Sequence, residues 1–326
     1  MNSNLEITRA AEILRSGGLV AFPTETVYGL GANAFDERAV ARVFEVKGRP
    51  RFDPLIVHIA DAHWVARLAA GFPAQAQKLA ERFWPGPLTI VLPKTAAVPD
   101  LVTAGCPTVA LRIPAHPLAQ SLLRAVDLPI AAPSANAFGR ISPTSAAHVR
   151  EQMGDAIDLV IDGGSCHIGI ESTVVQVVDD RVTILRQGGT TLEEIEALVG
   201  IVTIAAPFEG VEGSAGRAAP GMLTRHYAPR TPLIVWTRDA ARAGEGLSPT
   251  GASRGLLAFR EGADRGPFAR VEVLSPKGDL REAAANFFSA LRRLDAAGLE
   301  LIVAELLPES GLGRAINDRL RRAAHS

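Results

Sequence analysis

The stretch of residues 19–59 constrains the fold of this chain more than any other part of its sequence. It begins with the apolar run LVAF at residues 19–22, which predicts a short buried strand. The strand ends at Pro23 and opens into a loop of small hydroxyl residues and glycines, TETVYGLG. Because glycines and short hydroxyl side chains let a backbone approach a ligand closely, this loop is a candidate binding loop.

A helix is predicted directly after the loop, with Asp36 as its N-cap. Its apolar residues fall largely on one face: Ala39, Val40, Val43, Phe44 and Val46. The helix ends in the run KGRPR at residues 47–51, where a glycine stops it and three cations lie within five residues.

The next predicted strand, LIVHI at residues 55–59, carries one histidine in an otherwise apolar run. Each feature also has a purely structural explanation, since cations after a helix complement its dipole and a lone strand histidine is usually a core residue. The combination of hydroxyl–glycine loop, cation cluster and strand histidine instead predicts a site for an anionic ligand.

The overall composition is that of a foldable globular protein. The chain has 326 residues, of which 47% are hydrophobic and 21% charged, and this length has room for two domains. A net charge of −1 excludes a generally basic nucleic-acid binder but leaves a local basic groove open. Two cysteines make neither a disulfide framework nor a zinc site. We find no signal peptide and no apolar run of transmembrane length, so we expect a soluble, cytoplasmic protein.

The order of predicted elements divides the chain into three parts. Residues 1–204 mix strands and helices, with hairpin-linked later strands, which predicts a mixed α/β domain with a twisted sheet. In the predicted linker, residues 205–231, eleven of the first seventeen residues are Ala, Gly or Pro. Residues 232–326 alternate strands with helices, which predicts a smaller three-layer domain with a largely parallel sheet.

Several well-known catalytic motifs are absent from the sequence. There is no P-loop, no G-x-S-x-G elbow and no histidine spacing for a metal, and Gly311-Leu312-Gly313 is only half a dinucleotide fingerprint. What remains is a set of hydroxyls, amides and single cations at predicted strand ends: Thr24, Lys47, Arg49, Arg51, His58, Arg112, Ser134, Asn136, Ser142, Ser172 and Arg186. This inventory suits recognition of phosphates and carboxylates by position and charge, without a covalent nucleophile.

The motifs that carry these residues resemble the YrdC domain family. They are PTETVYGLG (23–31), KGRP (47–50), PLIVH (54–58), WPGPLT (84–89), LRIP (111–114), PSAN (133–136), SPT (142–144), ESTVV (171–175) and LRQGG (185–189). HYAP (226–229) and GLGRAINDRLRRAA (311–324) are similar to the longer, two-domain form of the family. The resemblance covers nearly the whole chain and implies a twisted mixed sheet with a deep concave site, followed by a smaller Rossmann-like domain.

The resemblance implies a nucleotidyltransferase that makes L-threonylcarbamoyladenylate from L-threonine, bicarbonate or CO₂, and ATP, with release of pyrophosphate. A separate transferase complex then moves the threonylcarbamoyl group onto adenosine 37 of tRNA. Mg²⁺ is expected with ATP, held mainly by phosphate oxygens and water, with Glu25 and Glu171 as the nearest acidic residues. No protein metal site, no membrane contact and at most a weak tRNA contact are expected.

The resemblance also implies a role for each motif residue. Lys47 and Arg49 would act at the reacting phosphates. The L-threonine pocket would be lined by Thr24, His58, Arg112, Ala132 and Ser172. The nucleotide would be bound by Lys47, Arg49, Arg51, Thr108, Ser134, Asn136, Ser142 and Arg186, with His226 and Tyr227 closing over the site as a lid.

Other functions remain open at this point. A non-catalytic module that binds double-stranded RNA or tRNA would need phosphate contacts spread over a face, whereas the cations here lie singly at strand ends. Carbamoyl transfer in hydrogenase maturation also uses a YrdC domain, but this chain has no C-x-x-C pairs. A structural partner with a degenerate site is disfavoured because the polar motif positions are intact.

Overall fold

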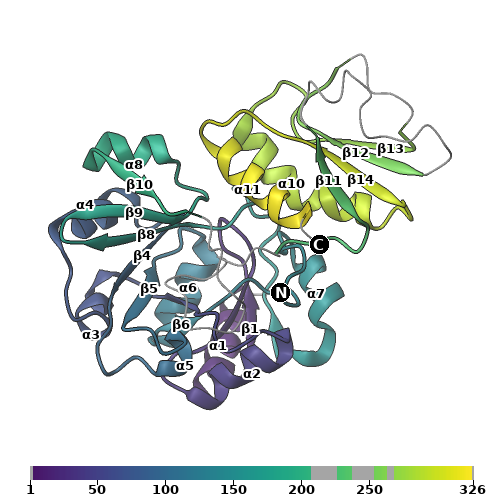
Figure 1. Ribbon diagram of the computed structural model, residues 1–326. Coiled ribbons are helices and arrows are strands. Elements are labelled where there is room, and N and C mark those ends of the chain that lie inside the picture. The colour runs from purple at the N-terminus through teal and green to yellow at the C-terminus, as the bar shows by residue number, and fades with distance from the viewer. Residues whose placement is uncertain (1–2, 207–225, 237–252, 263–267, 325–326) are drawn as a thin grey trace. The chain divides into compact units, whose positions relative to one another are not determined.

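The structure is a computed structural model that describes residues 3–206, 226–236, 253–262 and 268–324 (Figure 1). It divides into two compact units. The first comprises Met1–Phe138, Ser142–His167 and Glu171–Met222, and the second comprises Gly139–Ile141, Ile168–Ile170 and Leu223–Ser326. Most of the predicted linker, residues 207–225, lies outside the described residues, and its last residues belong to the second unit.

The first unit is built on a ten-stranded mixed sheet with the order β10-β9-β8-β4-β5-β3-β6-β2-β1-β7. The pairs β3–β5, β4–β8, β1–β7 and β9–β10 are parallel and the others antiparallel, which confirms the predicted mixed α/β class. The strands are β1 (Val20–Phe22), β2 (Gly29–Asn33), β3 (Ile56–His58), β4 (Leu88–Pro93), β5 (Thr108–Arg112), β6 (Ile130–Ala131), β7 (Leu159–Val160), β8 (Thr173–Val178), β9 (Arg181–Arg186) and β10 (Val202–Ile204).

Eight α-helices of the first unit are described: α1 (Ser3–Arg15), α2 (Glu37–Lys47), α3 (Val65–Leu68), α4 (Ala74–Phe83), α5 (Asp100–Thr103), α6 (Pro117–Val126), α7 (Ala146–Met153) and α8 (Leu192–Val199). The predicted limits of α2 are confirmed, because Asp36 accepts bonds from the backbone N–H groups of Arg38 and Ala39 and Gly48 ends the helix with φ at 61°. Thr191 and Glu194 have capping-box spacing in the sequence, and both bonds of the box are present at the start of α8.

The sequence predicts a helix around residues 61–70 and another that begins at residues 142–144, and both predictions are wrong in detail. Residues 61–70 form a short 3₁₀ turn (Ala62–Trp64) and a single helical turn, α3, because Ala69 leaves the helix to form a β-bridge with Lys94. Residues 142–144 do not begin α7, whose N-cap is Ser145. The carbonyls of Pro143 and Thr144 instead accept hydrogen bonds from Tyr28 and Cys166, which keeps the segment outside the helix.

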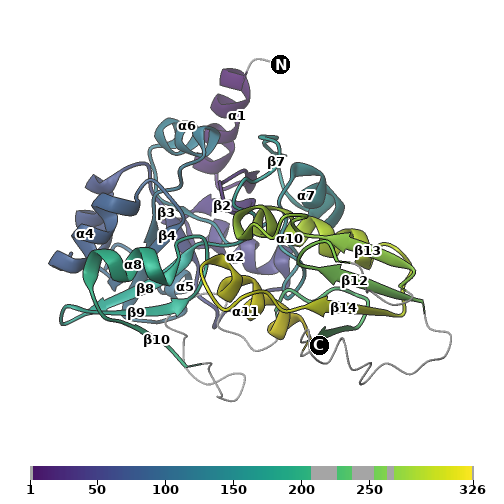
Figure 2. The same ribbon diagram turned by 90° about the horizontal axis from the view of Figure 1, so that it is seen from above.

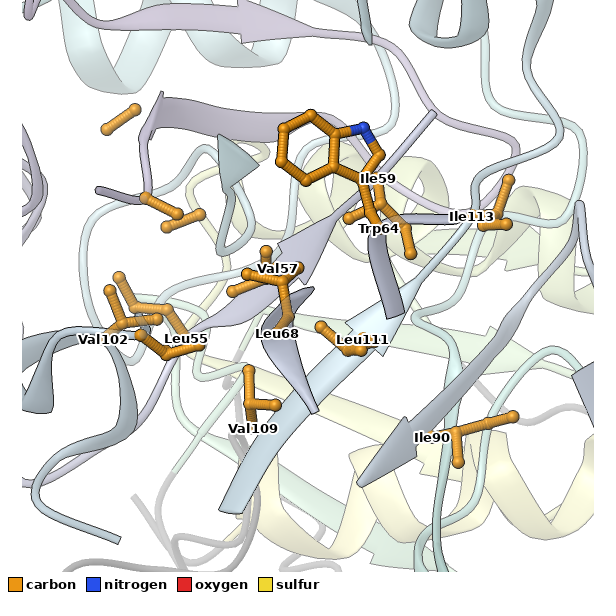
Figure 3. Packing of buried hydrophobic residues seen from close by; sticks show 14 of the residues in the cluster. Leu55, Val57, Ile59, Trp64, Leu68, Ile90, Val102, Val109, Leu111 and Ile113 are labelled. Atoms are coloured by element: carbon orange, nitrogen blue, oxygen red, sulfur yellow. The ribbon is translucent and has the colours of Figure 1, made fainter. Parts of the chain in front are cut away.

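The alternation of side chains along the central strands separates two faces of the sheet. Val57, Leu111 and Ile90 lie opposite one another on neighbouring strands and belong to the large core cluster (Figure 3). Their neighbours in sequence, Ile56, Ala110 and Val91, form a much smaller apolar cluster on the other face together with Val174 of β8. Farther along the sheet, α1 and α6 pack side by side over a third cluster (Figure 2).

The second unit contains a four-stranded sheet whose three strand pairs are all parallel, as the sequence predicts. Its order is β11-β14-β12-β13, with β11 (Leu233–Trp236), β12 (Arg254–Ala258), β13 (Arg270–Val273) and β14 (Leu301–Glu305). Two helices pack against this sheet and against each other, α10 (Leu280–Asp295) and α11 (Leu312–Ala324). Asp279 caps α10, and its side chain accepts bonds from the backbone N–H groups of Arg281 and Glu282.

Candidate active site

The candidate site lies on the sheet face that carries the small apolar cluster. His58 ends β3 and Arg112 ends the parallel strand β5, and the two residues are directly opposite in the register. Counting back by two along each strand leads to Ile56 and Ala110 of the small cluster, so both polar side chains share its face. The ends of two parallel strands therefore bring together two residues that are 54 positions apart in sequence, 112 minus 58.

Arg112 is held rigidly by two protein acceptors. Its Nε donates to the carbonyl of Gly86 at 3.1 Å and its Nη2 donates to Glu25 Oε1 at 2.7 Å. The other oxygen of Glu25 accepts a bond from the backbone N–H of Ala115 at 3.1 Å. The side chains of this ion pair are only 4% and 1% exposed, so the carboxylate compensates the burial of the guanidinium. Nη1 has no hydrogen-bond partner among the described residues, and it is the group available to a ligand carboxylate.

His58 is a neutral side chain in this site. Burial, together with the nearby Arg112 guanidinium, lowers the pKa of His58 to about 3. The ring meets Phe22 edge to face, with 6.1 Å between centroids. Above pH 5 the imidazole therefore acts as a neutral hydrogen-bonding group and has no proton to give as an acid.

Ser172 and Arg186 meet at the same edge because of a β-bulge. By strict alternation Arg186 would share the face of Ile184, which lies in the large core. The register shifts by one residue between β8 and β9, so that Arg186 pairs with Val174 of the small cluster. Its Nη2 donates to the carbonyl and to Oγ of Ser172, at 2.9 and 3.1 Å, and Thr89 Oγ1 lies 2.8 Å from the same hydroxyl.

Thr24 uses its hydroxyl within its own loop. The Oγ1 atom donates to the carbonyl of Val27 at 2.6 Å, lies 2.8 Å from Thr26 Oγ1 and accepts the backbone N–H groups of both residues at 3.2 Å. Such local bonds fix a tight turn. The side chain is buried beside Glu25, so the turn delivers the carboxylate that pairs with Arg112.

The Lys47 amine ties helix α2 to the PSAN loop. Its Nζ donates to the carbonyls of Ser134 and Asn136 at 2.6 and 2.5 Å, so the structure brings together three of the predicted nucleotide residues. Burial lowers the pKa of Lys47 well below its usual range, and the positive charge of Arg49 lowers it further. The contacts to Ser134 and Asn136 run through their backbone carbonyls, which the sequence did not predict.

The other two cations of the cluster differ in their surroundings. Arg49 forms a buried ion pair with Asp53 at 2.9 Å and donates to the carbonyl of Pro54 at 2.8 Å. These contacts hold the turn that leads into β3. Arg51 is exposed on that turn, so the structure does not bring the three cations together into one buried group.

The remaining predicted residues of the first unit are Ser142, Ala132 and Thr108. Ser142 is fully buried and donates to Glu171 Oε1 at 2.6 Å. The N–H of Ala132 is committed to the carbonyl of Ile56 at 2.9 Å, which leaves the carbonyl as its backbone group for a ligand. Thr108 begins β5 and lies about 13 Å along the strand from Arg112 at the other end.

His226 and Tyr227 belong to the second unit. The Tyr227 ring is buried, with its centroid 5.8 Å from that of Phe288, and Arg319 Cζ lies 5.4 Å from its centre. Its backbone is in the left-handed region, with φ at 67°, and the His226 ring lies 4.1 Å away. The sequence placed both residues in a linker, and the packing against α10 and α11 is the reason that they belong to the second unit instead.

Sequence reasoning missed Asp53 and Thr89, and it named Glu25 only as an acidic residue near Mg²⁺, without its contact to Arg112. Each is a polar partner of a predicted residue. For Glu25 a signal existed, because a carboxylate stands within a loop of hydroxyl and apolar residues. Asp53 follows Arg49 by four positions, but no helix joins them, so the spacing alone predicts no contact.

The part of the chain that the structure describes has neither a metal-binding cluster nor a membrane-spanning helix. No three His, Cys, Asp or Glu side chains there are close enough to hold a metal ion. Cys106 and Cys166 form no disulfide, and burial raises the pKa of the Cys166 thiol to about 12. No described helix is long and apolar enough to span a bilayer.

Two family models match the chain. The model of the Sua5, YciO and YrdC proteins, described as "Telomere recombination", matches residues 12–188, and one described as "Threonylcarbamoyl-AMP synthase, C-terminal domain" matches residues 190–325. Proteins named threonylcarbamoyl-AMP synthase from Pyrococcus abyssi and Bacillus subtilis are 47% and 43% identical, over 98% of this chain and 94% and 93% of their own lengths. The crystal structure of P. abyssi Sua5 complexed with L-threonine is similar, with a TM-score of 0.89 and 45% identity over 99% of this chain and 95% of that chain.

Proposed function

This chain belongs to the family of the Sua5, YciO and YrdC proteins, and we propose that it synthesises L-threonylcarbamoyladenylate from L-threonine, bicarbonate or CO₂, and ATP. Pyrophosphate is the second product, which makes the enzyme a nucleotidyltransferase. The product would supply a downstream transferase complex with the group that it attaches to adenosine 37 of tRNA. The proposal is supported by relatives of this name at 47% and 43% identity over nearly the whole chain.

The single observation that carries the proposal is the arrangement of Arg112. A buried guanidinium that is neutralised by Glu25 and oriented by Gly86 leaves Nη1 for a carboxylate. An α-amino acid presents such a group. His58, neutral and next to Arg112 in the register, and the Ser172 hydroxyl offer hydrogen bonds to the rest of a small polar substrate. The solved P. abyssi relative carries L-threonine, which agrees with an amino-acid pocket.

The chemistry that we propose needs position and charge rather than a strong base. The amine nitrogen of threonine forms a bond to CO₂ and loses a proton, giving a carbamate. A carbamate oxygen then bonds to the α-phosphorus of ATP while the bond from that phosphorus to the bridging oxygen breaks, and pyrophosphate leaves. Alignment of the two substrates and neutralisation of phosphate charge supply most of the rate in such a transfer.

We propose the nucleotide-binding residues on physical grounds. Lys47 is a buried cation that already orders the loop of Ser134 and Asn136, and an arriving phosphate would add a charge-assisted bond to its amine. Arg49, Arg51, Thr108, Ser142 and Arg186 complete the proposed set on the first unit, and His226 and Tyr227 are proposed from the second.

Mg²⁺ is proposed as the partner of the triphosphate, with phosphate oxygens and water as its main ligands. Glu25 does not fit as a metal ligand, because its two oxygens are taken by Arg112 and Ala115. Glu171 already accepts the Ser142 hydroxyl. The ion would neutralise charge on the leaving pyrophosphate.

The test is mass spectrometry of a reaction with the pure protein, L-threonine, bicarbonate, Mg²⁺ and ATP. Threonylcarbamoyl-AMP and pyrophosphate should form only when threonine is present. The matched control is the double variant Glu25→Gln/Arg112→Gln, which removes the ion pair without leaving one buried charge and should form no product. Intact ATP together with tight binding of double-stranded RNA would contradict the proposal and favour the RNA-binding alternative.

A further inference from the structure

Tyr28 is buried in the first unit and no role has so far been assigned to it. It is the last residue before β2, and its main chain is hydrogen-bonded to two other segments. Its N–H donates to the carbonyl of Pro143 at 2.9 Å, and its carbonyl accepts the N–H of Ala135 at 2.8 Å. One residue therefore lies between the segment that carries Ser142 and the loop that carries Ser134 and Asn136.

The side chain of Tyr28 reaches a third segment, residues 162–166. Its hydroxyl donates to the carbonyl of Gly164 at 2.8 Å and accepts the N–H of Gly163 at 3.1 Å. Burial raises the pKa of Tyr28 to about 12, so the phenol stays protonated and keeps its donor at physiological pH.

The third segment returns to the second, which closes a ring of hydrogen bonds. The N–H of Cys166 donates to the carbonyl of Thr144 at 2.9 Å, next to Pro143, to which Tyr28 is bonded. The ring thus runs from Tyr28 to Pro143 and Thr144, on to Cys166 and Gly164, and back to the Tyr28 hydroxyl. The two side-chain bonds of this ring are those of the Tyr28 hydroxyl. A substitution can remove them without a change in the backbone.

We propose that Tyr28 is a positioning residue for nucleotide binding, which acts by holding the segment of Ser142 and the loop of Ser134 and Asn136 in a fixed relation. This inference rests on the proposed function, because the nucleotide role of those residues is part of it. The residues of the threonine side depend on other contacts: Arg112 on Glu25 and Gly86, and Ser172 on Thr89 and Arg186. The hydroxyl of Tyr28 therefore affects the two substrates unequally.

The variant Tyr28→Phe keeps the ring in the core and removes only the hydroxyl. We expect the KM for ATP to rise about 3- to 10-fold from the loss of the two hydroxyl hydrogen bonds, with the KM for L-threonine within about twofold of the original protein. The matched control is Thr95→Val, in a loop away from the ring. It removes a 2.7 Å bond from the Thr95 hydroxyl to the carbonyl of Arg67 and should leave both constants unchanged.

Two results would overturn the inference. One is a lower melting temperature with both KM values unchanged, which would make the hydroxyl purely structural. The other is an equal rise in both constants, which would indicate general damage to the site. If Tyr28→Phe does not fold, hydrogen exchange of the unsubstituted protein decides: ATP with Mg²⁺ should slow exchange in residues 133–138, 142–146 and 162–166 together, and protection that omits 162–166 would contradict the ring.

The inference about Tyr28 can still be tested if the proposed function is wrong. If the unsubstituted protein makes no threonylcarbamoyl-AMP, calorimetric titration with ATP and Mg²⁺ still compares the affinities of the original and Tyr28→Phe proteins. A weaker affinity in the variant supports the positioning role even then, and equal affinities contradict it.

Discussion

The Arg112 and Lys47 regions both bury a cation in the first unit, and they compensate its charge in different ways. Arg112 faces the carboxylate of Glu25, whereas the nearest partners of Lys47 Nζ are the neutral carbonyls of Ser134 and Asn136. Accordingly, burial lowers the pKa of Lys47 strongly. A paired cation recognises a ligand through its remaining donor, and a cation without an adjacent carboxylate gains most from an anion that binds.

The largest effect is expected when one member of the Arg112–Glu25 pair is removed. Arg112→Gln leaves a carboxylate buried without its cation, which should lower the free energy of unfolding by about 3–5 kcal/mol. Product formation at low threonine concentration should fall at least about 100-fold. Chemical denaturation and threonine titrations measure both quantities, and an unchanged KM for threonine would contradict the role of Nη1.

Arg49→Gln should resemble Arg112→Gln in stability, since it leaves Asp53 buried without its cation and should lower the free energy of unfolding by about 3–5 kcal/mol. ATP use should fall as well. The exposed Arg51→Gln is the matched control within the same cluster and should change stability by less than about 0.5 kcal/mol. Equal stability of the two variants would show that the Arg49–Asp53 pair is unimportant to the fold.

Lys47→Met tests the other kind of cation. Among the described residues the Lys47 amine forms no ion pair and bonds to two neutral carbonyls, so we expect a smaller loss of stability than for Arg49→Gln, of about 1–2 kcal/mol, from the two lost hydrogen bonds. The KM for ATP should nevertheless rise about 10- to 100-fold. ATP kinetics that do not change would remove Lys47 from the phosphate site.

The pH dependence of stability tests whether the His58 ring beside Arg112 is neutral in the folded protein. Its folded-state pKa, about 3, lies below the ordinary value near 6.5, so the unfolded chain binds the proton more readily. The stability contributed by the neutral ring is complete above pH 6.5 and is lost as the pH falls from 6.5 towards 3. Denaturation of the original protein and His58→Gln between pH 4.5 and 7.5 should show a shallower fall for the variant, and parallel curves would contradict the assignment.

The smallest effect is expected at Thr89, which touches the threonine side only through Ser172. Thr89→Val should lower the free energy of unfolding by about 1 kcal/mol and raise the KM for threonine by less than about threefold. The KM for ATP should not change. A larger change for ATP than for threonine would mean that the two regions are not separate.

Much of the fold could be predicted from the sequence because its signals are local. The N-cap Asp36, the left-handed Gly48 and the capping box of Thr191 act within a few residues, and all three are present. The prediction failed where a long-range contact overrides local preference, as at Ala69, which pairs with Lys94. The same holds for the candidate site: the motifs predicted its residues, but not the ion pairs of Arg112 with Glu25 and of Arg49 with Asp53.

The sequence by itself determined which loops carry the polar side chains that we propose for the chemistry, where most helices begin and end, and which strands are apolar. Only the tertiary structure decided that Arg112 meets Glu25 across 87 positions of sequence and that a β-bulge turns Arg186 toward Ser172. The physical reason is that caps and turns form within one or two turns of chain, whereas a contact across a sheet depends on register. A shift of one residue in register moves a side chain to the opposite face.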